Sequence, residues 1–243
     1  FFNYVKIKLT SKKFGGDMST IINQIKEKAK LLGKTIVLPE SEDERVLKAA
    51  ELIKREKIAK VILVGDEIRI KADAEKLGVN LTGIGIVNPR TFPKFDAYVA
   101  EFVKLREKKG MTEQVARQIM FTEPRFFGAM MVRMGDAHGM VAGSASPTAD
   151  VLRASIQVVG TKPGLRTVSS CFLMVMPEAT KQYGNNGVLI FSDCGVVPNP
   201  TSEQLADIAT SAASSARSLV AMEPKVALLS FSTKGSAKHE DVD

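Results

Sequence analysis

The chain has 243 residues, of which 44% are hydrophobic and 25% charged, so it can form one large domain or two smaller ones, each with its own core. No apolar stretch is long enough to cross a bilayer, which argues against a membrane-spanning protein. The net charge of +7 suits an anionic small molecule, and no basic run with interleaved aromatic residues points to nucleic acid.

The first segment, residues 1–17, is predicted to be a translated leader that is not part of the fold. Gly15-Gly16-Asp17-Met18 can be back-translated as GGA GGT GAT ATG, a ribosome-binding sequence that runs into a start codon. The segment has no long apolar run and no small-residue cleavage site, so it is a poor signal peptide. We expect the fold to begin at Met18; a genuine basic N-terminal strand or tail is the alternative.

From residue 34 onward, short apolar runs alternate with segments of helical periodicity. In the helical segment 43–56, for example, the residues that share one face are Val46, Leu47, Ala50 and Ile53. The predicted strands of this part are Lys34–Glu40, Lys60–Gly65, Gly83–Pro89 and Gly139–Gly143. The predicted helices are Asp43–Glu56, a polar helix ending near Leu77, Asp96–Lys109, Thr112–Met120 and Phe126–Met134.

The alternation continues to the end of the chain. Helices are predicted over Pro147–Val159 and Thr201–Met222, and strands over Val168–Met176, Gly187–Cys194 and Val226–Phe231. This order indicates an α/β protein with a largely parallel sheet that is covered on both sides. A loop rich in glycine and proline at residues 160–164 suggests two α/β domains, 18–163 and 164–243.

The cysteines and histidines indicate neither disulfides nor a metal site. Cys171 and Cys194 lie in apolar segments, which predicts buried thiols in a reducing compartment and hence a cytoplasmic protein. His138 and His239 are the two histidines, and there is no CxxC motif, so no metal-ligand cluster is visible.

Ligands of open parallel sheets bind beyond the carboxyl ends of the strands, and the segment after Gly139–Gly143 is the first candidate. Ser146 is suited to be a helix N-cap and Pro147 a first-turn residue, and a helix N-terminus with hydroxyl groups beside it favours an anion. Arg153 lies on the same predicted helix. An ordinary capped helix with a surface arginine is an equally good interpretation.

Three other strand ends carry polar residues. Asp193 could be catalytic, but capping of the loop backbone explains it more simply. The segment SFSTKGSA could cradle a phosphate, although it lacks the spacing of a Walker loop. The acidic residues of LPESEDERV fit the start of a helix, where the helix dipole favours negative charge.

Seven segments, in one collinear order, together resemble the phosphate acetyltransferase (phosphotransacetylase) family. They are VLPESEDERVLKAA, LREKKGMT, FFGAMMVRMGDAHGMVAG, TADVLRASIQVVGTKPG, VSSCFLMVMPE, FSDCGVVPNPTSEQLADIA and SFSTKGSA. The resemblance runs from about Ile21 to the last residue. Phosphate butyryltransferase is the related alternative, and a non-catalytic domain that binds acyl-CoA or acetyl phosphate is an alternative of another class.

The resemblance implies a two-domain α/β/α sandwich, akin to isocitrate and isopropylmalate dehydrogenases, in a homodimer. The implied reaction moves an acetyl group between coenzyme A and phosphate, with acetyl-CoA and acetyl phosphate as the acyl-bearing substrates. It needs no metal or redox cofactor.

By motif, the resemblance implies that two arginines and the hydroxyl groups near Arg153 contact the substrates. It also implies that the SFSTKGSA segment forms part of the wall of the substrate-binding cleft. The residues are Arg153, Arg106, Ser144, Ser146, Thr148, Ser232, Thr233 and Lys234. The chain departs from the family pattern at three positions. Pro147 stands where a hydroxyl residue is expected, and Ala154 stands where a proline often follows the arginine. Ala179 lies near the position at which some members carry an active-site cysteine.

Family members are about one third longer than this chain. We therefore expect a partial chain, truncated at its C-terminus, whose catalytic residues are unknown because the general base and a Ser-Arg pair belong to the missing part. The 243 residues alone are expected to be inactive and to expose apolar surface.

Overall fold

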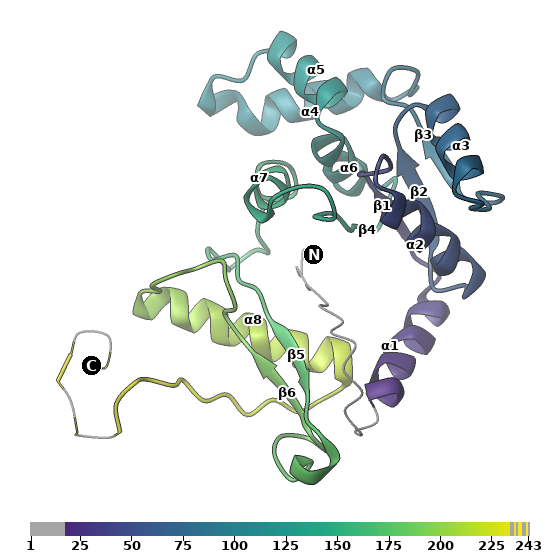
Figure 1. Ribbon diagram of the computed structural model, residues 1–243. Helices are drawn as coiled ribbons and strands as arrows, with labels where there is room; N and C mark the ends of the chain where they lie inside the picture. Colours follow the sequence, from purple (N-terminus) through teal and green to yellow (C-terminus); the bar gives the residue numbers. More distant parts are fainter. Residues whose placement is uncertain (1–17, 234–235, 237, 240–241, 243) are drawn as a thin grey trace. The chain divides into compact units, whose positions relative to one another are not determined.

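The computed structural model describes residues 18–233, 236, 238–239 and 242 (Figure 1). The predicted leader and Lys234 lie outside the described residues. The chain divides into two compact units, Ile22–Thr161 and Lys162–Asp243, with residues 18–21 assigned to the latter. No helix in the described part of the chain has the length and apolar character needed to cross a membrane.

The first unit is built on a four-stranded sheet in which every pairing is parallel. Its strand order is β3-β2-β1-β4, so β1 is central, β4 flanks it on one side and β3 forms the far edge (Figure 1). The bounds are β1 Thr35–Leu38, β2 Lys60–Val64, β3 Gly85–Val87 and β4 Gly139–Met140. The predicted α/β class with a parallel sheet is confirmed, although β3 and β4 are shorter than predicted.

The sheet is apolar on both faces because neighbouring strand residues enter two separate cores. Val37 and Val64 belong to the core formed with α4 to α7. The residues next to them, Leu38 and Leu63, belong to the core formed with α2 and α3. The short, nearly continuous apolar runs that predicted buried strands therefore reflect real burial on both sides.

The predicted helices of this unit all form, and a further helix, α1, which was not predicted from the sequence, begins at Met18. Their bounds are α1 Met18–Leu32, α2 Glu44–Arg55, α3 Glu67–Lys76, α4 Phe95–Arg106 with the 3-10 turn η1 Glu107–Lys109, α5 Glu113–Thr122, α6 Pro124–Arg133 and α7 Thr148–Val158. Three starts are capped by side chains, because the oxygens of Asp43, Asp66 and Thr112 accept backbone N–H groups of α2, α3 and α5. The predicted apolar face of α2 is confirmed, since Leu47 and Ala50 are fully buried.

The second unit contains a two-stranded sheet and one long helix. Strand β5 (Phe172–Val175) pairs with β6 (Val188–Phe191), and the 3-10 turn η2 (Glu178–Thr180) lies between them in the sequence. The pairing is antiparallel, so the prediction of a largely parallel sheet is wrong here: this connection leads into a hairpin instead of a crossover. Helix α8 (Ser202–Val220) begins with a capping box in which Thr201 and Gln204 bond reciprocally.

The predicted strand Val226–Phe231 does not form. These residues have no regular secondary structure, and Leu228, Leu229 and Phe231 are 65%, 92% and 71% exposed. A strand needs a neighbour to bond its backbone N–H and C=O groups, and none pairs with this segment in the part of the chain that the structure describes. The β-forming composition of the segment is therefore not sufficient for a strand.

The two cysteines differ in burial. Cys171 is buried, as predicted, whereas Cys194 is only partly buried. Both are free thiols, and burial raises the pKa of each above its ordinary value.

Asp193 caps the loop that follows β6, as the simpler interpretation of the sequence predicted. Its Oδ2 accepts the backbone N–H groups of Val196 and Val197, each at 2.8 Å, and its Oδ1 accepts the backbone N–H of Ser170 at 2.6 Å. Burial would raise the pKa of Asp193, but these hydrogen bonds outweigh burial and hold the pKa well below the usual range.

Gly128 lets α6 approach the carboxyl ends of β1 and β4 closely. A Cβ at this position would lie 3.0 Å from Met140 Sδ and 3.3 Å from Pro39 Cβ. Met140 ends β4 and Pro39 follows β1, so the absent side chain fixes how closely the helix lies to both strand ends.

The close approach at Gly128 predicts a size-dependent loss of stability. We expect Gly128→Val to lower the free energy of unfolding by about 1–3 kcal/mol, because the branched side chain overpacks the contact. Gly128→Ala is the matched control, since its gain in helix propensity of about 0.5–1 kcal/mol opposes the cost of shifting the flexible Met140 side chain. Urea unfolding measures both; a valine variant as stable as the parent would contradict this packing.

The carboxylate of Asp193 predicts a pH-dependent contribution to stability. Its folded pKa lies below the unfolded value of about 3.9, so the contribution is complete above that pH and is lost as the pH falls through the folded pKa. Asp193→Asn should lower the melting temperature at pH 7, and the difference from the parent should shrink below about pH 4. Calorimetric scans across pH test this, and a pH-independent difference would disagree with it.

Candidate functional site

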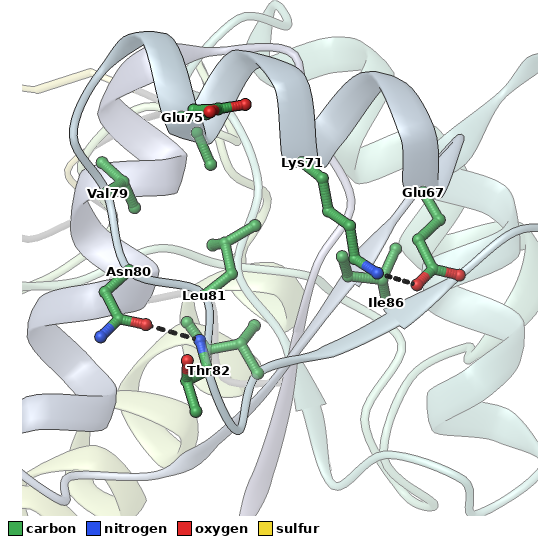
Figure 2. Close-up of a pocket in the computed structure, with 10 residues that line it drawn as sticks. Glu67, Lys71, Glu75, Val79, Asn80, Leu81, Thr82 and Ile86 are labelled. Atoms are coloured by element: carbon green, nitrogen blue, oxygen red, sulfur yellow. Dashed lines mark hydrogen bonds and ion pairs between the residues drawn. The ribbon is translucent and has the colours of Figure 1, made fainter.

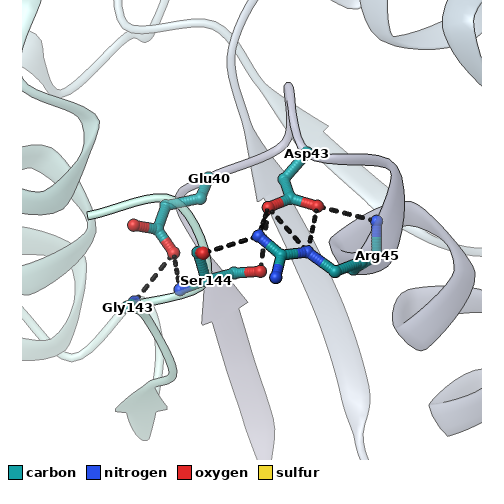
Figure 3. A network of polar contacts seen from close by, with 5 residues as sticks. All are labelled: Glu40, Asp43, Arg45, Gly143 and Ser144. Carbon is teal, nitrogen blue, oxygen red and sulfur yellow. Dashed lines mark hydrogen bonds and ion pairs between the residues drawn. The ribbon is translucent and has the colours of Figure 1, made fainter. Parts of the chain in front are cut away.

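The carboxyl ends of β1 and β4 lie side by side at one edge of the first unit's sheet. The parallel register pairs Ile36 with Gly139 and Val37 with Met140, so the loops that follow both strands leave the sheet together. Figure 3 shows that the loop after β1 contributes Glu40 and Asp43, which face the loop after β4. This is the position at which open parallel sheets bind ligands.

Glu40 anchors the loop after β4. Its Oε2 accepts the backbone N–H groups of Gly143 and Ser144, each at 2.7 Å (Figure 3). Burial would raise the pKa of Glu40, but hydrogen bonds from the Ser146 side chain and from these amides outweigh burial and lower it. Glu40 is therefore a charged acceptor that holds two consecutive N–H groups in place.

Asp43 forms a second link between the two loops. It accepts the backbone N–H of Arg45 at 2.8 Å as the N-cap of α2, and it also accepts the hydroxyl of Ser144 at 2.9 Å. The Arg45 guanidinium pairs with Asp43 and donates to the carbonyl oxygen of Ser144 at 2.6 Å. The hydrogen bond from Arg45 is the main cause that holds the pKa of Asp43 well below its usual range.

Two arginines approach the start of α7 from different helices. Arg125 on α6 donates from Nη1 to the Ser146 hydroxyl at 2.7 Å and also pairs with Glu123. The carboxylate of Asp150 lies 3.0 Å from Arg153 Nη1 and 3.7 Å from Arg125 Nη1. Hydroxyl groups and two guanidinium groups thus gather around one helix start, together with the carboxylates of Glu123 and Asp150 that pair with them. A helix start with cations beside it is suited to an oxyanion.

The structure brings together four of the predicted site residues. Ser144 and Ser146 belong to the loop after β4, Thr148 is the first residue of α7, and Arg153 lies on the second turn of that helix. The prediction of Ser146 as N-cap is wrong, because Pro147 holds that position without a side-chain bond. The Ser146 hydroxyl is instead engaged by Arg125.

Arg106 stands apart from this cluster in its contacts. It is the last residue of α4 and partly buried. Its Nε is buried without a hydrogen-bond partner among the described residues, and within them no hydrogen bond or ion pair joins it to Arg125 or Arg153.

Ser232 and Thr233 lie in the second unit, and their hydrogen bonds are local. The Ser232 hydroxyl lies 2.9 Å from that of Ser236, which also donates to the carbonyl oxygen of Thr233 at 2.8 Å. Lys234, the cation predicted for the same cradle, lies outside the described residues.

Sequence reasoning missed Arg125 and the bridging roles of Glu40 and Asp43. The acidic residues after the first predicted strand were interpreted as the start of a helix, which is correct for Asp43 but incomplete. The predicted parallel sheet could have shown that Glu40 and Asp43 contact the loop after β4, because the carboxyl ends of neighbouring parallel strands lie at the same edge of a sheet. No sequence signal distinguishes Arg125 from other helix arginines; only the packing of α6 brings it to Ser146.

A pocket of about 550 Å³ lies elsewhere in the first unit, beside α3 and β3 (Figure 2). Its cation, Lys71, is paired with Glu67 at 2.6 Å, and Glu75 adds another carboxylate to the lining. The rest of the lining consists of Asn80, Thr82 and the apolar side chains of Ala74, Val79, Leu81, Ile84 and Ile86. This chemistry does not favour an anion. Among the described residues no cluster of His, Cys, Asp and Glu could hold a metal ion.

Comparisons with known proteins agree on the family. The family model described as Phosphate acetyl/butaryl transferase matches residues 20–243. A curated relative, the phosphate acetyltransferase of Thermoanaerobacterium thermosaccharolyticum, is 46% identical over 92% of this chain and 67% of its own length.

Two solved structures are similar throughout the matched region. The EutD phosphotransacetylase from Staphylococcus aureus has a TM-score of 0.80 and 40% identity, and a phosphotransacetylase from Streptococcus pyogenes has 0.83 and 35%. The matches cover 93% and 92% of this chain and 65% of each solved chain. The chain thus spans about two thirds of the length of these relatives, and the resemblance seen in the sequence is confirmed.

The bridge from Glu40 to the loop after β4 predicts a local change on neutralisation. In Glu40→Gln, the amides of Gly143 and Ser144 should exchange with solvent roughly tenfold faster at pH 7, because a charge-assisted hydrogen bond is stronger than a neutral one. Glu42→Gln is the matched control, since Glu42 is exposed and pairs with Arg69. Equal protection in the parent and Glu40→Gln would refute the anchoring role.

Proposed function

Because this chain belongs to the phosphate acetyl/butaryl transferase family, we propose that the protein moves an acetyl group between coenzyme A and phosphate. The reaction is acetyl-CoA plus phosphate giving coenzyme A plus acetyl phosphate, and its reverse. In the direction that consumes acetyl phosphate, a base removes the proton of the coenzyme A thiol. The thiolate forms a C–S bond with the acetyl carbonyl carbon, the C–O bond breaks, and phosphate leaves with the bonding electron pair.

The observation that carries this proposal is the cluster at the ends of β1 and β4. A phosphoryl group requires cations and N–H donors, and this edge of the sheet offers the guanidinium of Arg153 beside the start of α7. Arg153 is 58% exposed at its side chain, so an anion can reach it from solvent. In the transition state, its charge would stabilise the negative charge that develops on the phosphate oxygens.

Other contacts are proposed from the family motifs. We propose Ser144, Thr148 and Arg106 as further contacts for phosphate or coenzyme A, and the family motif adds Ser232 and Thr233 as substrate contacts. Lys234, which belongs to the same motif, lies outside the described residues. Ser146 belongs to the same site, and its hydroxyl is engaged by Arg125. We also propose that the two compact units are the two domains of an α/β/α sandwich enzyme that acts as a homodimer; light scattering of the purified protein tests the dimer.

In this proposal the 243 residues supply the anion-binding side and do not suffice for turnover. The carboxylates beside the cluster, Glu40 and Asp43, have lowered pKa values and accept hydrogen bonds from the backbone. Such groups are poor bases for a thiol, so the thiol proton would go to a group outside this cluster.

The proposal predicts that Arg153→Ala abolishes most of the activity. The complete protein is assayed for coenzyme A-dependent consumption of acetyl phosphate. We expect kcat/KM to fall roughly 100-fold or more, the range seen when one charge-stabilising donor is removed. The matched control is Arg69→Ala, which removes an exposed arginine on α3 and should leave activity unchanged.

Three results would contradict parts of the proposal. Absence of turnover from the folded, complete protein would reject the acyltransferase and favour a binding domain. Faster turnover of butyryl phosphate than acetyl phosphate would assign the other acyl chain within the family. Substantial turnover by residues 1–243 alone would refute the proposed need for further residues.

A further inference from the structure

Asp150 lies between two arginines that belong to different helices. Its Oδ1 is 3.0 Å from Arg153 Nη1, within the same helix, and its Oδ2 is 3.7 Å from Arg125 Nη1 on α6. The first distance is that of a hydrogen-bonded ion pair, whereas the second is too long for a hydrogen bond. In this structure Asp150 is therefore bonded to Arg153 and only near Arg125.

This arrangement creates a competition at Arg153. The guanidinium that the proposed function assigns to the substrate anion already has an anionic partner, Asp150. A phosphate arriving at Arg153 would place two negative groups on one cation. Like charges at such short range repel, so anion binding is weakened unless Asp150 has another partner.

Arg125 has the properties of that other partner. Its side chain is 18% exposed, compared with 58% for Arg153, so it is the less accessible of the two to a ligand from solvent. Its guanidinium is fixed by Glu123 and by the bond from Nη1 to the Ser146 hydroxyl. A shift of the Asp150 carboxylate by less than 1 Å toward Nη1 would close the 3.7 Å gap to bonding distance.

We propose that Arg125 is a positioning residue that takes over Asp150 when a phosphate anion binds Arg153. The inference rests on the proposed function in one respect, namely that Arg153 is the anion contact. Arg125 acts through Asp150 and does not touch the anion. It serves as the second member of a pair of cations that share one carboxylate.

A double-mutant cycle with inorganic phosphate as the probe tests this exchange. Calorimetry measures phosphate binding to the complete protein, Arg125→Ala, Asp150→Asn and the double variant. Arg125→Ala should weaken binding roughly tenfold, as for the loss of one hydrogen bond to a charged group. Asp150→Asn should bind at least as tightly as the parent, because it removes the competitor. The double variant should regain the affinity that Arg125→Ala lost.

The rescue separates positioning from the other possible roles of Arg125. If Arg125 contacted phosphate directly, or only stabilised α6, Asp150→Asn would not restore binding in the Arg125→Ala background, and that result overturns the proposal. Unchanged binding in Arg125→Ala also overturns it. Arg133→Ala is the matched control, because Arg133 lies on the same helix and pairs with Glu101. Its phosphate affinity should equal that of the parent.

The remaining outcomes are equally decisive. If Arg125→Ala does not fold, as judged by circular dichroism, Arg125→Lys replaces it and should weaken binding less than tenfold, since the charge remains without the fork. If the parent protein does not bind phosphate at all, the inference fails. If the complete protein binds phosphate with the expected rescue but shows no turnover, the proposed enzyme activity is rejected and the exchange of Asp150 stands. If it turns over substrate but the double variant shows no rescue, the enzyme activity stands and the exchange is rejected.

Discussion

The first unit depends on a single physical requirement, that the backbone N–H groups leaving β4 find acceptors at a crowded sheet edge. Glu40, which follows the neighbouring strand β1, supplies the acceptor for both Gly143 and Ser144. A hydrogen bond to a charged acceptor is stronger than a neutral one, so this carboxylate, which bonds two consecutive N–H groups, fixes the path of the loop. The start of α7, and with it Ser146 and Arg153, lies where it does because that loop is fixed.

Acidic and basic side chains are paired around the two loops that Glu40 joins. Two of the carboxylates near the two loops are paired with an arginine, Asp43 with Arg45 and Asp150 with Arg153, with Arg125 nearby. These pairs are partly solvent-exposed, so each contributes little to the free energy of folding. Their value lies in orientation, because a guanidinium that is paired in the free protein is already placed for an anion that can displace its partner.

The sequence predicted most elements of the fold but only part of the site, and the reasons are local and non-local respectively. The apolar face of α2 and the buried strands β1 and β2 are determined by neighbouring residues, so periodicity was enough to find them. Arg125 reaches Ser146 only because Gly128 lets α6 lie close to Met140 and Pro39, a contact that no spacing rule contains. The antiparallel β5–β6 pair and the unformed strand Val226–Phe231 show the same limit, since strand order and pairing depend on partners distant in the sequence.

Both units use one device, a carboxylate after a strand that accepts several backbone N–H groups: Glu40 after β1 and Asp193 after β6. The device has a chemical consequence. Each bond from an N–H group stabilises the ionised carboxylate, lowers its pKa and reduces its power to take a proton from a thiol. These carboxylates hold loops in place and are unsuited to general base catalysis. If the chain takes part in the acyl exchange proposed above, the proton transfer requires a group whose pKa has not been lowered by such bonds.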